Sequence, residues 1–141
     1  LARLVDPAAP ASCTRVVAAM QAWPHLVSGH GALDDTLMRA GEGAMVSKGG
    51  AEGYHGLGIR TRDGRSIGLA LKMADGNPRA KGPVLVRVLE ALGLVEPAVL
   101  ARLGPPGRPP IVNHRQQVVG EMRAVVNVES WGSAAAISTA A

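Results

Sequence analysis

Apolar side chains in the first part of the chain recur at helical spacing. Between residues 12 and 23 they return every three or four positions, which lines one face of a helix, and Pro24 ends that helix. The residues on this face are Val16, Val17, Met20 and Trp23. Ser12 is predicted to be the N-cap, and Asp34 or Asp35 is predicted to cap a second, shorter helix.

Short apolar runs in the middle of the chain predict three strands. These runs cover residues 44–48, 54–60 and 66–73. Asp63-Gly64, between the last two runs, is a strong signal for a tight turn. The second and third strands are therefore expected to form an antiparallel hairpin.

Helical spacing returns after this hairpin. Asn77 is predicted to cap the next helix with Pro78 at its first position, where the missing N–H costs nothing, and Gly93 ends it. Its apolar stripe, expected to pack on the sheet, is Val84, Leu85, Val88, Leu89 and Leu92. A shorter helix is predicted over residues 97–103.

The remaining segment begins with a proline-rich stretch over residues 105–110, which predicts a stiff extended connector. A last strand over residues 118–119 and 122–128, paired with 111–112 across 113–116, is then predicted. Residues 129–141 show no pattern and are interpreted as a tail. The fold class is therefore α/β, with helices packed on an antiparallel sheet in a domain over residues 1–128.

Composition limits the core and the class of partner. The chain has 141 residues, enough for one domain, and 47% of them are hydrophobic, but it contains no Phe, so the core must be aliphatic. The net charge is +4. Because the basic residues are scattered and aromatic stacking groups are scarce, nucleic acid is not expected as a partner. The densest basic group, Arg60, Arg62 and Arg65, is interpreted as solvated charge around a turn.

Targeting and redox signals are few. No run approaches the roughly 20 apolar residues of a membrane span, and no basic leader precedes an apolar run, so a cytoplasmic protein with no membrane partner is expected. Cys13 is the only cysteine and is predicted to be a small buried thiol. His25, His30, His55 and His114 share no metal-ligand spacing, and each is interpreted as a surface or hydrogen-bonded histidine.

The stretch from Ser47 to Gly53 is the best candidate for chemistry. It places Lys48 on a strand beside Gly49 and Gly50, so a substrate can approach the backbone there. A lysine at the wall of a site can move a proton or stabilise an anion when burial tunes its pKa. The backbone N–H of Ala51, just past the glycines, could stabilise an oxyanion.

Several segments in one order and spacing resemble the C-terminal half of the type II asparaginase family, of the Rhizobium etli kind. The most specific are Lys48-Gly49-Gly50-Ala51-Glu52-Gly53 and the strand that ends at Asp75-Gly76; the segments resembling the family are 17–20, Pro24, 29–38, 47–53 and 75–80. The resemblance implies the C-terminal part of a fold like that of serine β-lactamases and glutaminases. It also implies hydrolysis of L-asparagine to L-aspartate and ammonia through a serine-lysine acyl-enzyme.

The resemblance also assigns roles to residues of this chain. Lys48 matches the strand lysine that exchanges a proton with a serine, and Ala51 matches an oxyanion-hole position. Gly49, Gly50 and Glu52 would bind substrate, Glu52 at the α-amino group. No serine here has a lysine three residues later, so the nucleophile is expected from the N-terminal half of the same enzyme, a partner in which zinc would also be held. No cofactor is expected on this chain, and Cys13 inherits no metal role.

Two alternative functions stay open. A related glutaminase-like or β-lactamase-like amidohydrolase would use the same strand lysine on another substrate. A non-catalytic α/β module would use Lys48-Gly49-Gly50 only to bind an anion or another ligand. The oligomeric state, including a homodimer, is also open. A Ser-x-x-Lys element upstream in the same frame would favour the enzyme.

Overall fold

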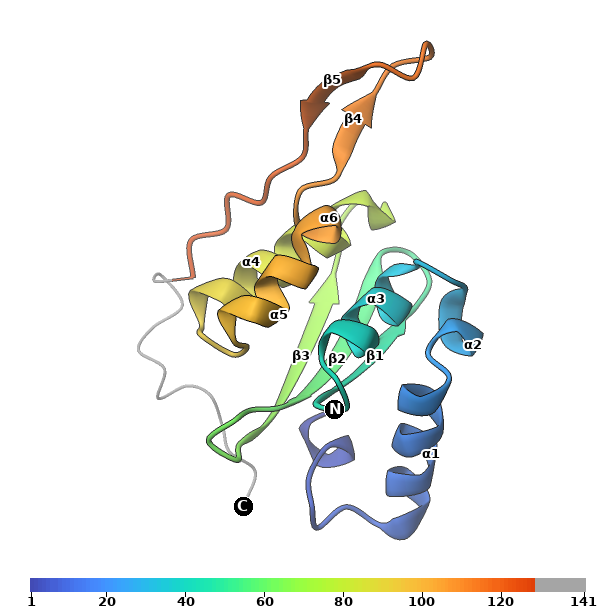
Figure 1. Cartoon of the computed structure of the whole chain (residues 1–141), viewed down its shortest axis with the longest axis vertical. Coiled ribbons are helices and arrows are strands. Elements are labelled where there is room, and N and C mark those ends of the chain that lie inside the picture. Colours follow the sequence, from blue (N-terminus) through green and yellow to red (C-terminus); the bar gives the residue numbers. More distant parts are fainter. Residues whose placement is uncertain (129–141) are drawn as a thin grey trace.

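The structure is a computed structural model, and it describes residues 1–128 (Figure 1). The helices are η1 (Ala2–Leu4), α1 (Ala11–Ala22), α2 (His25–Ser28), α3 (Leu33–Ala40), η2 (Pro78–Ala80), α4 (Lys81–Ala91), α5 (Pro97–Arg102) and α6 (Gly104–Gly107), with η marking 3₁₀ helices. The strands are β1 (Met45–Gly49), β2 (Tyr54–Arg60), β3 (Ser66–Lys72), β4 (Pro110–Val112) and β5 (Val118–Glu121). The predicted α/β class is confirmed. The predicted tail lies outside the described residues.

The central sheet is antiparallel with strand order β1-β2-β3. The predicted hairpin is confirmed, since β2 and β3 pair along their whole length, from Tyr54 with Lys72 to Arg60 with Ser66. Its turn is closed by the Arg65 N–H, which donates to the Thr61 hydroxyl at 3.0 Å. Among the described residues β1 pairs only with β2, so its other edge has no partner strand and its backbone groups there can bind side chains.

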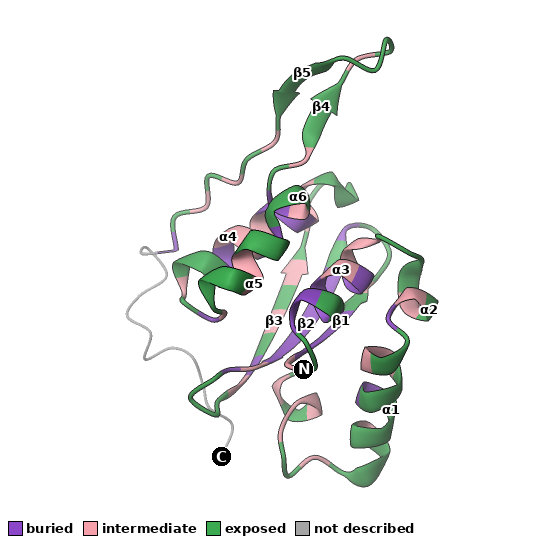
Figure 2. Ribbon diagram, in the orientation of Figure 1, coloured by how far each residue is buried: buried purple, intermediate pink, exposed green. Residues whose placement is uncertain are grey.

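One face of this sheet carries the main core (Figure 2). Leu57 and Ile59 from β2 cluster there with Leu37 of α3 and with Leu85 and Leu89 of α4. Leu57 and Leu89 are fully buried. The predicted packing of the α4 stripe on the sheet is therefore confirmed for Leu85 and Leu89, with Leu92 partly buried against the same cluster.

The opposite face of the sheet is lined with glycines. A Cβ added to Gly58 would lie 3.1 Å from the Leu1 carbonyl oxygen, and one added to Gly68 would lie 2.7 Å from the Ala2 nitrogen. The N-terminal segment can therefore lie directly on the strands. Beside it, Val17 of α1 packs with Val46 of β1.

The predicted capping and packing of the first helix were partly wrong. Pro10, not Ser12, is the N-cap of α1, and no side chain caps it. Val17 is buried, but Val16 and Trp23 are 57% and 60% exposed. Only part of the predicted apolar face is covered by the described residues, through Val17 and the partly buried Met20. Cys13 is only half-buried, so its predicted burial was also wrong.

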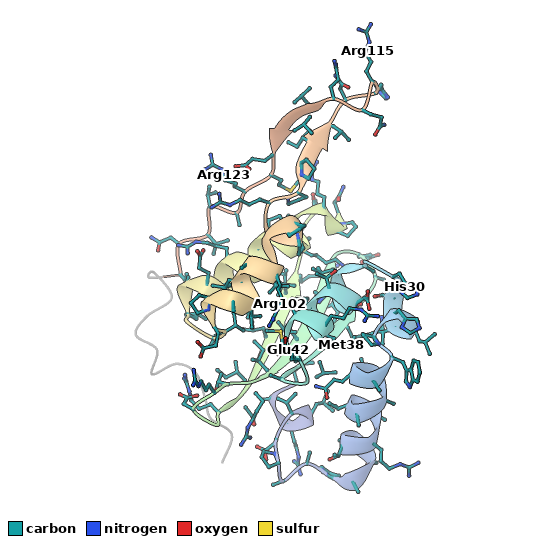
Figure 3. The ribbon with its side chains drawn as sticks, in the orientation of Figure 1. His30, Met38, Glu42, Arg102, Arg115 and Arg123 are labelled. Atoms are coloured by element: carbon teal, nitrogen blue, oxygen red, sulfur yellow. The ribbon has the colours of Figure 1, made fainter. Side chains whose placement is uncertain are left out.

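The proline-rich connector contains a helical turn, so the predicted extended conformation was wrong there. Pro105 and Pro106 occupy the first positions of α6, where no N–H is needed. The Gly107 and Arg108 N–H groups then each bond to a carbonyl four residues earlier, at 3.0 Å. Just before this turn, Arg102 of α5 reaches the Glu42 carboxylate at 2.8 Å (Figure 3).

The last hairpin projects away from the rest of the structure (Figure 1). β4 and β5 pair as predicted, although residues 122–128 do not continue the strand. Asn113 organises the turn, because its side-chain oxygen accepts the Arg115 N–H at 2.9 Å and the Gln117 N–H at 3.0 Å. Gln116 takes the left-handed conformation expected of a glycine, with φ of 59°.

Candidate functional site

Lys48 lies at the exposed edge of the central sheet. It is the fourth residue of β1, it is exposed, and it pairs in register with Gly56 of β2. Its ammonium group donates to the Gly49 carbonyl oxygen at 2.6 Å. The predicted position of this lysine on a strand is therefore found, but the described residues do not bury it.

The two glycines after Lys48 differ in their surroundings. A Cβ on Gly50 would lie 2.7 Å from Cδ1 of Tyr54, so the ring of Tyr54 already occupies that space. A Cβ on Gly49 would lie 3.4 Å from both Asp34 Oδ2 and Lys81 Nζ. At Gly50 the space predicted for a substrate is therefore occupied by the Tyr54 ring. Gly49 instead faces charged groups.

Ala51 and Glu52 belong to the turn between β1 and β2. The Ala51 carbonyl accepts the Tyr54 N–H at 3.1 Å, and the Ala51 N–H has no partner within residues 1–128. Glu52 is left-handed with φ of 51°, and its carboxylate lies 3.6 Å from Lys72 Nζ. An exposed N–H without a partner is compatible with an oxyanion donor. The substrate role of Glu52 stays a prediction.

A buried polar cluster that was not predicted from the sequence lies beside this edge. The Ser47 hydroxyl donates to Asp34 Oδ1 at 2.6 Å and lies 2.8 Å from Nε2 of His55. The other oxygen of Asp34 accepts the Gly49 N–H at 3.0 Å. Ser47, His55 and Asp34 are only 0%, 1% and 4% exposed. Helix α3 and strands β1 and β2 each contribute one side chain.

Electrostatics in this cluster favour a neutral histidine. Burial lowers the pKa of His55, the Asp34 carboxylate opposes that shift, and the Lys81 and Lys48 cations add to it. Since the Ser47 proton is given to Asp34, Nε2 of His55 is assigned as the donor to Ser47. Nδ1 of His55 is then a buried acceptor with no partner in residues 1–128.

The cluster is not a catalytic triad in spite of its composition. In a Ser-His-Asp triad the carboxylate binds the histidine and orients it toward the serine. Here Asp34 binds Ser47 directly, and Nδ1 of His55 has no carboxylate partner. Ser47 is also completely buried, so its hydroxyl cannot reach a substrate.

The capping role predicted for Asp34 or Asp35 was wrong. Ala32 is the N-cap of α3, and no side chain caps the helix. Asp34 is instead part of the buried cluster. Asp35 accepts the Gly31 N–H at 2.9 Å and pairs with Arg39 at 2.7 Å, and these bonds, the one to Gly31 above all, lower the pKa of Asp35. Two adjacent acidic residues thus serve different local structures.

One signal in the sequence could have revealed the cluster. Side chains alternate between the faces of a strand, so Ser47 and His55 fall on the face that carries Met45, Leu57 and Ile59. Polar residues at core-facing positions require partners. The sequence alone does not show that α3 supplies the carboxylate.

Two of the remaining histidine candidates lie against each other. His25 and His30 stack with ring centroids 4.5 Å apart. Within residues 1–128, no three His, Cys, Asp or Glu side chains are grouped to bind a metal, so these residues do not fit a zinc site of their own. In the same part of the chain, no helix has both the length and the apolar character that a membrane span requires.

Comparison with known protein families identifies the family of this α/β domain. Residues 1–124 match L-asparaginase II, and the chain belongs to this family. This family assignment supports an asparaginase-like function. The Rhizobium etli subtype stays a prediction. A search of curated proteins found no match.

Proposed function

We propose that this chain forms one wall of the active site of an amidohydrolase that converts L-asparagine to L-aspartate and ammonia. The observation that carries the proposal is the exposed Lys48 on the open edge of β1, in a chain of the L-asparaginase II family. The Ala51 N–H, which has no partner within residues 1–128, lies three residues further along the chain, in the turn after β1.

The proposed reaction is acyl transfer through a serine ester. The serine oxygen attacks the side-chain amide carbon of asparagine while its proton passes to a base, and ammonia leaves after gaining a proton. Water then hydrolyses the ester and releases aspartate. Lys48 exchanges protons with a second active-site serine, and the Ala51 N–H stabilises the oxyanion. Gly49, Gly50 and Glu52 line the substrate, with Glu52 at its ammonium group.

The nucleophile in this proposal comes from polypeptide outside the 141 residues. None of the seven serines has a lysine three residues later; they are Ser12, Ser28, Ser47, Ser66, Ser130, Ser133 and Ser138. That polypeptide must also cover Lys48, because a lysine that releases its proton near neutral pH needs partial burial. Any zinc would likewise need ligands from that polypeptide, since residues 1–128 hold no group of three candidate ligands.

The test uses Lys48→Ala and Lys48→Arg in the full-length protein. Both variants should fold, and kcat should fall by roughly 10²- to 10⁴-fold in Lys48→Ala, as expected for lost acid-base catalysis. Lys48→Arg should rescue poorly, because a guanidinium keeps its proton. Thermal melts and ammonia release are measured together.

The matched control is Arg62→Ala, which removes an exposed cation at the other end of the central sheet. Its kcat should equal that of wild type. A wild-type kcat in Lys48→Ala would overturn the catalytic role, and high activity in Lys48→Arg alone would make the lysine an electrostatic clamp. The isolated 141-residue chain should release no ammonia from asparagine, because acid-base groups cannot replace a nucleophile.

A further inference from the structure

Asp34 binds the residues on both sides of Lys48. One carboxylate oxygen accepts the Ser47 hydroxyl at 2.6 Å, and the other accepts the Gly49 backbone N–H at 3.0 Å. The two bonds therefore hold the chain immediately before and immediately after Lys48. Because side chains alternate along a strand, Asp34 holds β1 from the face opposite the lysine.

Contacts of this kind matter most for the backbone position of an edge strand, because it has a neighbouring strand on one side only. β1 receives backbone hydrogen bonds from β2 on one side only, in the part of the chain that the structure describes. Gln21 of α1 bonds to the Met45 carbonyl at 2.8 Å, near the start of the strand. At the other end, beside Lys48, the corresponding contact comes from Asp34.

Asp34 lies on a helix that is anchored at several points. It lies in the first turn of α3, where the helix dipole favours a negative charge. The helix is anchored by the buried Leu37 and Met38, and its last turn is bound by Arg102, which donates to the Ala40 carbonyl at 2.9 Å. His55 supports the Ser47 hydroxyl from β2.

We infer that Asp34, supported by Ser47 and His55, is a positioning residue that sets the backbone at Lys48 and so aims its amine in the active site. This inference rests on the catalytic role proposed for Lys48. A buried carboxylate is an expensive way to gain stability alone, since ion pairs and buried polar groups are often replaceable by apolar side chains. By holding the backbone beside the proton-transferring Lys48, the Asp34 carboxylate would also contribute to catalysis.

The test is a double-mutant cycle in the full-length protein. Asp34→Asn keeps the shape of the side chain but removes its negative charge and one of its two acceptor oxygens, so the pair of charge-assisted bonds accepted by the carboxylate is lost. We expect kcat for asparagine to fall roughly 10- to 100-fold with a nearly unchanged KM, as for a displaced catalytic group. In the Lys48→Ala background, Asp34→Asn should cause no further loss.

The matched control is Asp35→Asn, which alters the neighbouring buried carboxylate of the same helix. It removes bonds to Gly31 and Arg39 and should lower the melting temperature while leaving kcat unchanged. If Asp34→Asn fails to fold, Ser47→Ala takes its place in the cycle, because it removes one of the two bonds.

The outcomes separate this inference from the proposed function. A wild-type kcat in Asp34→Asn, or an equal loss with and without the Lys48 amine, would overturn the positioning role. A wild-type kcat in Lys48→Ala would overturn the proposed function instead. A loss of kcat that disappears in the Lys48→Ala background supports both.

Discussion

The central sheet and the terminal hairpin are built from the same local signals but have opposite surroundings. Both contain antiparallel strands joined by a turn in which a side-chain oxygen accepts a backbone N–H. The accepting oxygen belongs to Thr61 in the central sheet and to Asn113 in the hairpin. In the central sheet, Leu57 and Ile59 are buried under helices. In the hairpin, Val118 and Val119 are 68% and 62% exposed.

The difference shows that turn chemistry and strand pairing form a hairpin without deciding what it packs against. A two-stranded hairpin is only marginally stable in water by itself, whereas a covered sheet shares a core with its helices. Mutations at comparable positions in the two regions should therefore have very different effects on stability.

The largest effect on stability is expected in the core shared by the helices and the central sheet. Leu89→Ala removes a fully buried side chain of α4 and should lower the free energy of unfolding by about 2–5 kcal/mol. Urea denaturation of the 141-residue chain measures this change. A loss below about 1 kcal/mol would mean that the helix does not cover the sheet as described.

A smaller contrast is expected for two strand glycines. Gly68→Ala in β3 would place a Cβ 2.7 Å from the Ala2 nitrogen, so the N-terminal segment must move, and we expect a loss of about 1–3 kcal/mol. Gly120→Ala in β5 would meet Ile111 at an ordinary 3.8 Å and should be neutral or slightly stabilising. Equal melting temperatures for the two variants would contradict the contrast.

The pH dependence of stability should also distinguish the regions. The pKa of His55 is lowered from 6.5 in the folded state, so the unfolded chain binds a proton first as the pH falls. The contribution of His55 to the free energy of unfolding is fully present above pH 6.5, and it should decrease below that pH until the folded-state pKa is reached. His55→Gln should reduce this slope in denaturation curves measured between about pH 8 and 5. An unchanged slope would locate the titration elsewhere.

The smallest effect is expected in the hairpin. Val119→Ala removes atoms that are already mostly in water, so the free energy of unfolding should change by less than about 0.5 kcal/mol. The same denaturation assay provides the comparison with Leu89→Ala. A loss of several kcal/mol would show that the hairpin is covered in solution.

Much of the fold followed from periodicity in the sequence. The Asp63-Gly64 turn and its two strands, and the stripe of α4, agree with the structure because their patterns are long and regular. Burial of α1 was overestimated, since helical spacing identifies an apolar face without showing how much of it finds a partner. The helical turn at Pro105 was missed because prolines suit both an extended chain and a first helical turn.

The candidate site was only partly predictable. Lys48 and its strand were found because glycines follow the lysine directly in sequence. The cluster of Asp34, Ser47 and His55 was missed because its residues are 13 and 8 positions apart and meet only through tertiary packing. The local sequence around Asp34 was explained by helix capping, so its role in the buried cluster was not predicted.

The glycines on the second face of the central sheet have a consequence for sequence variation. Side chains at positions 58 and 68 would occupy the space that the first residues of the chain now fill. In related sequences these positions and the N-terminal segment should therefore change together, with glycine kept wherever the segment follows the same course. A relative with a larger residue at either position should carry its N-terminal segment elsewhere, which makes this pair of regions a natural site of covariation.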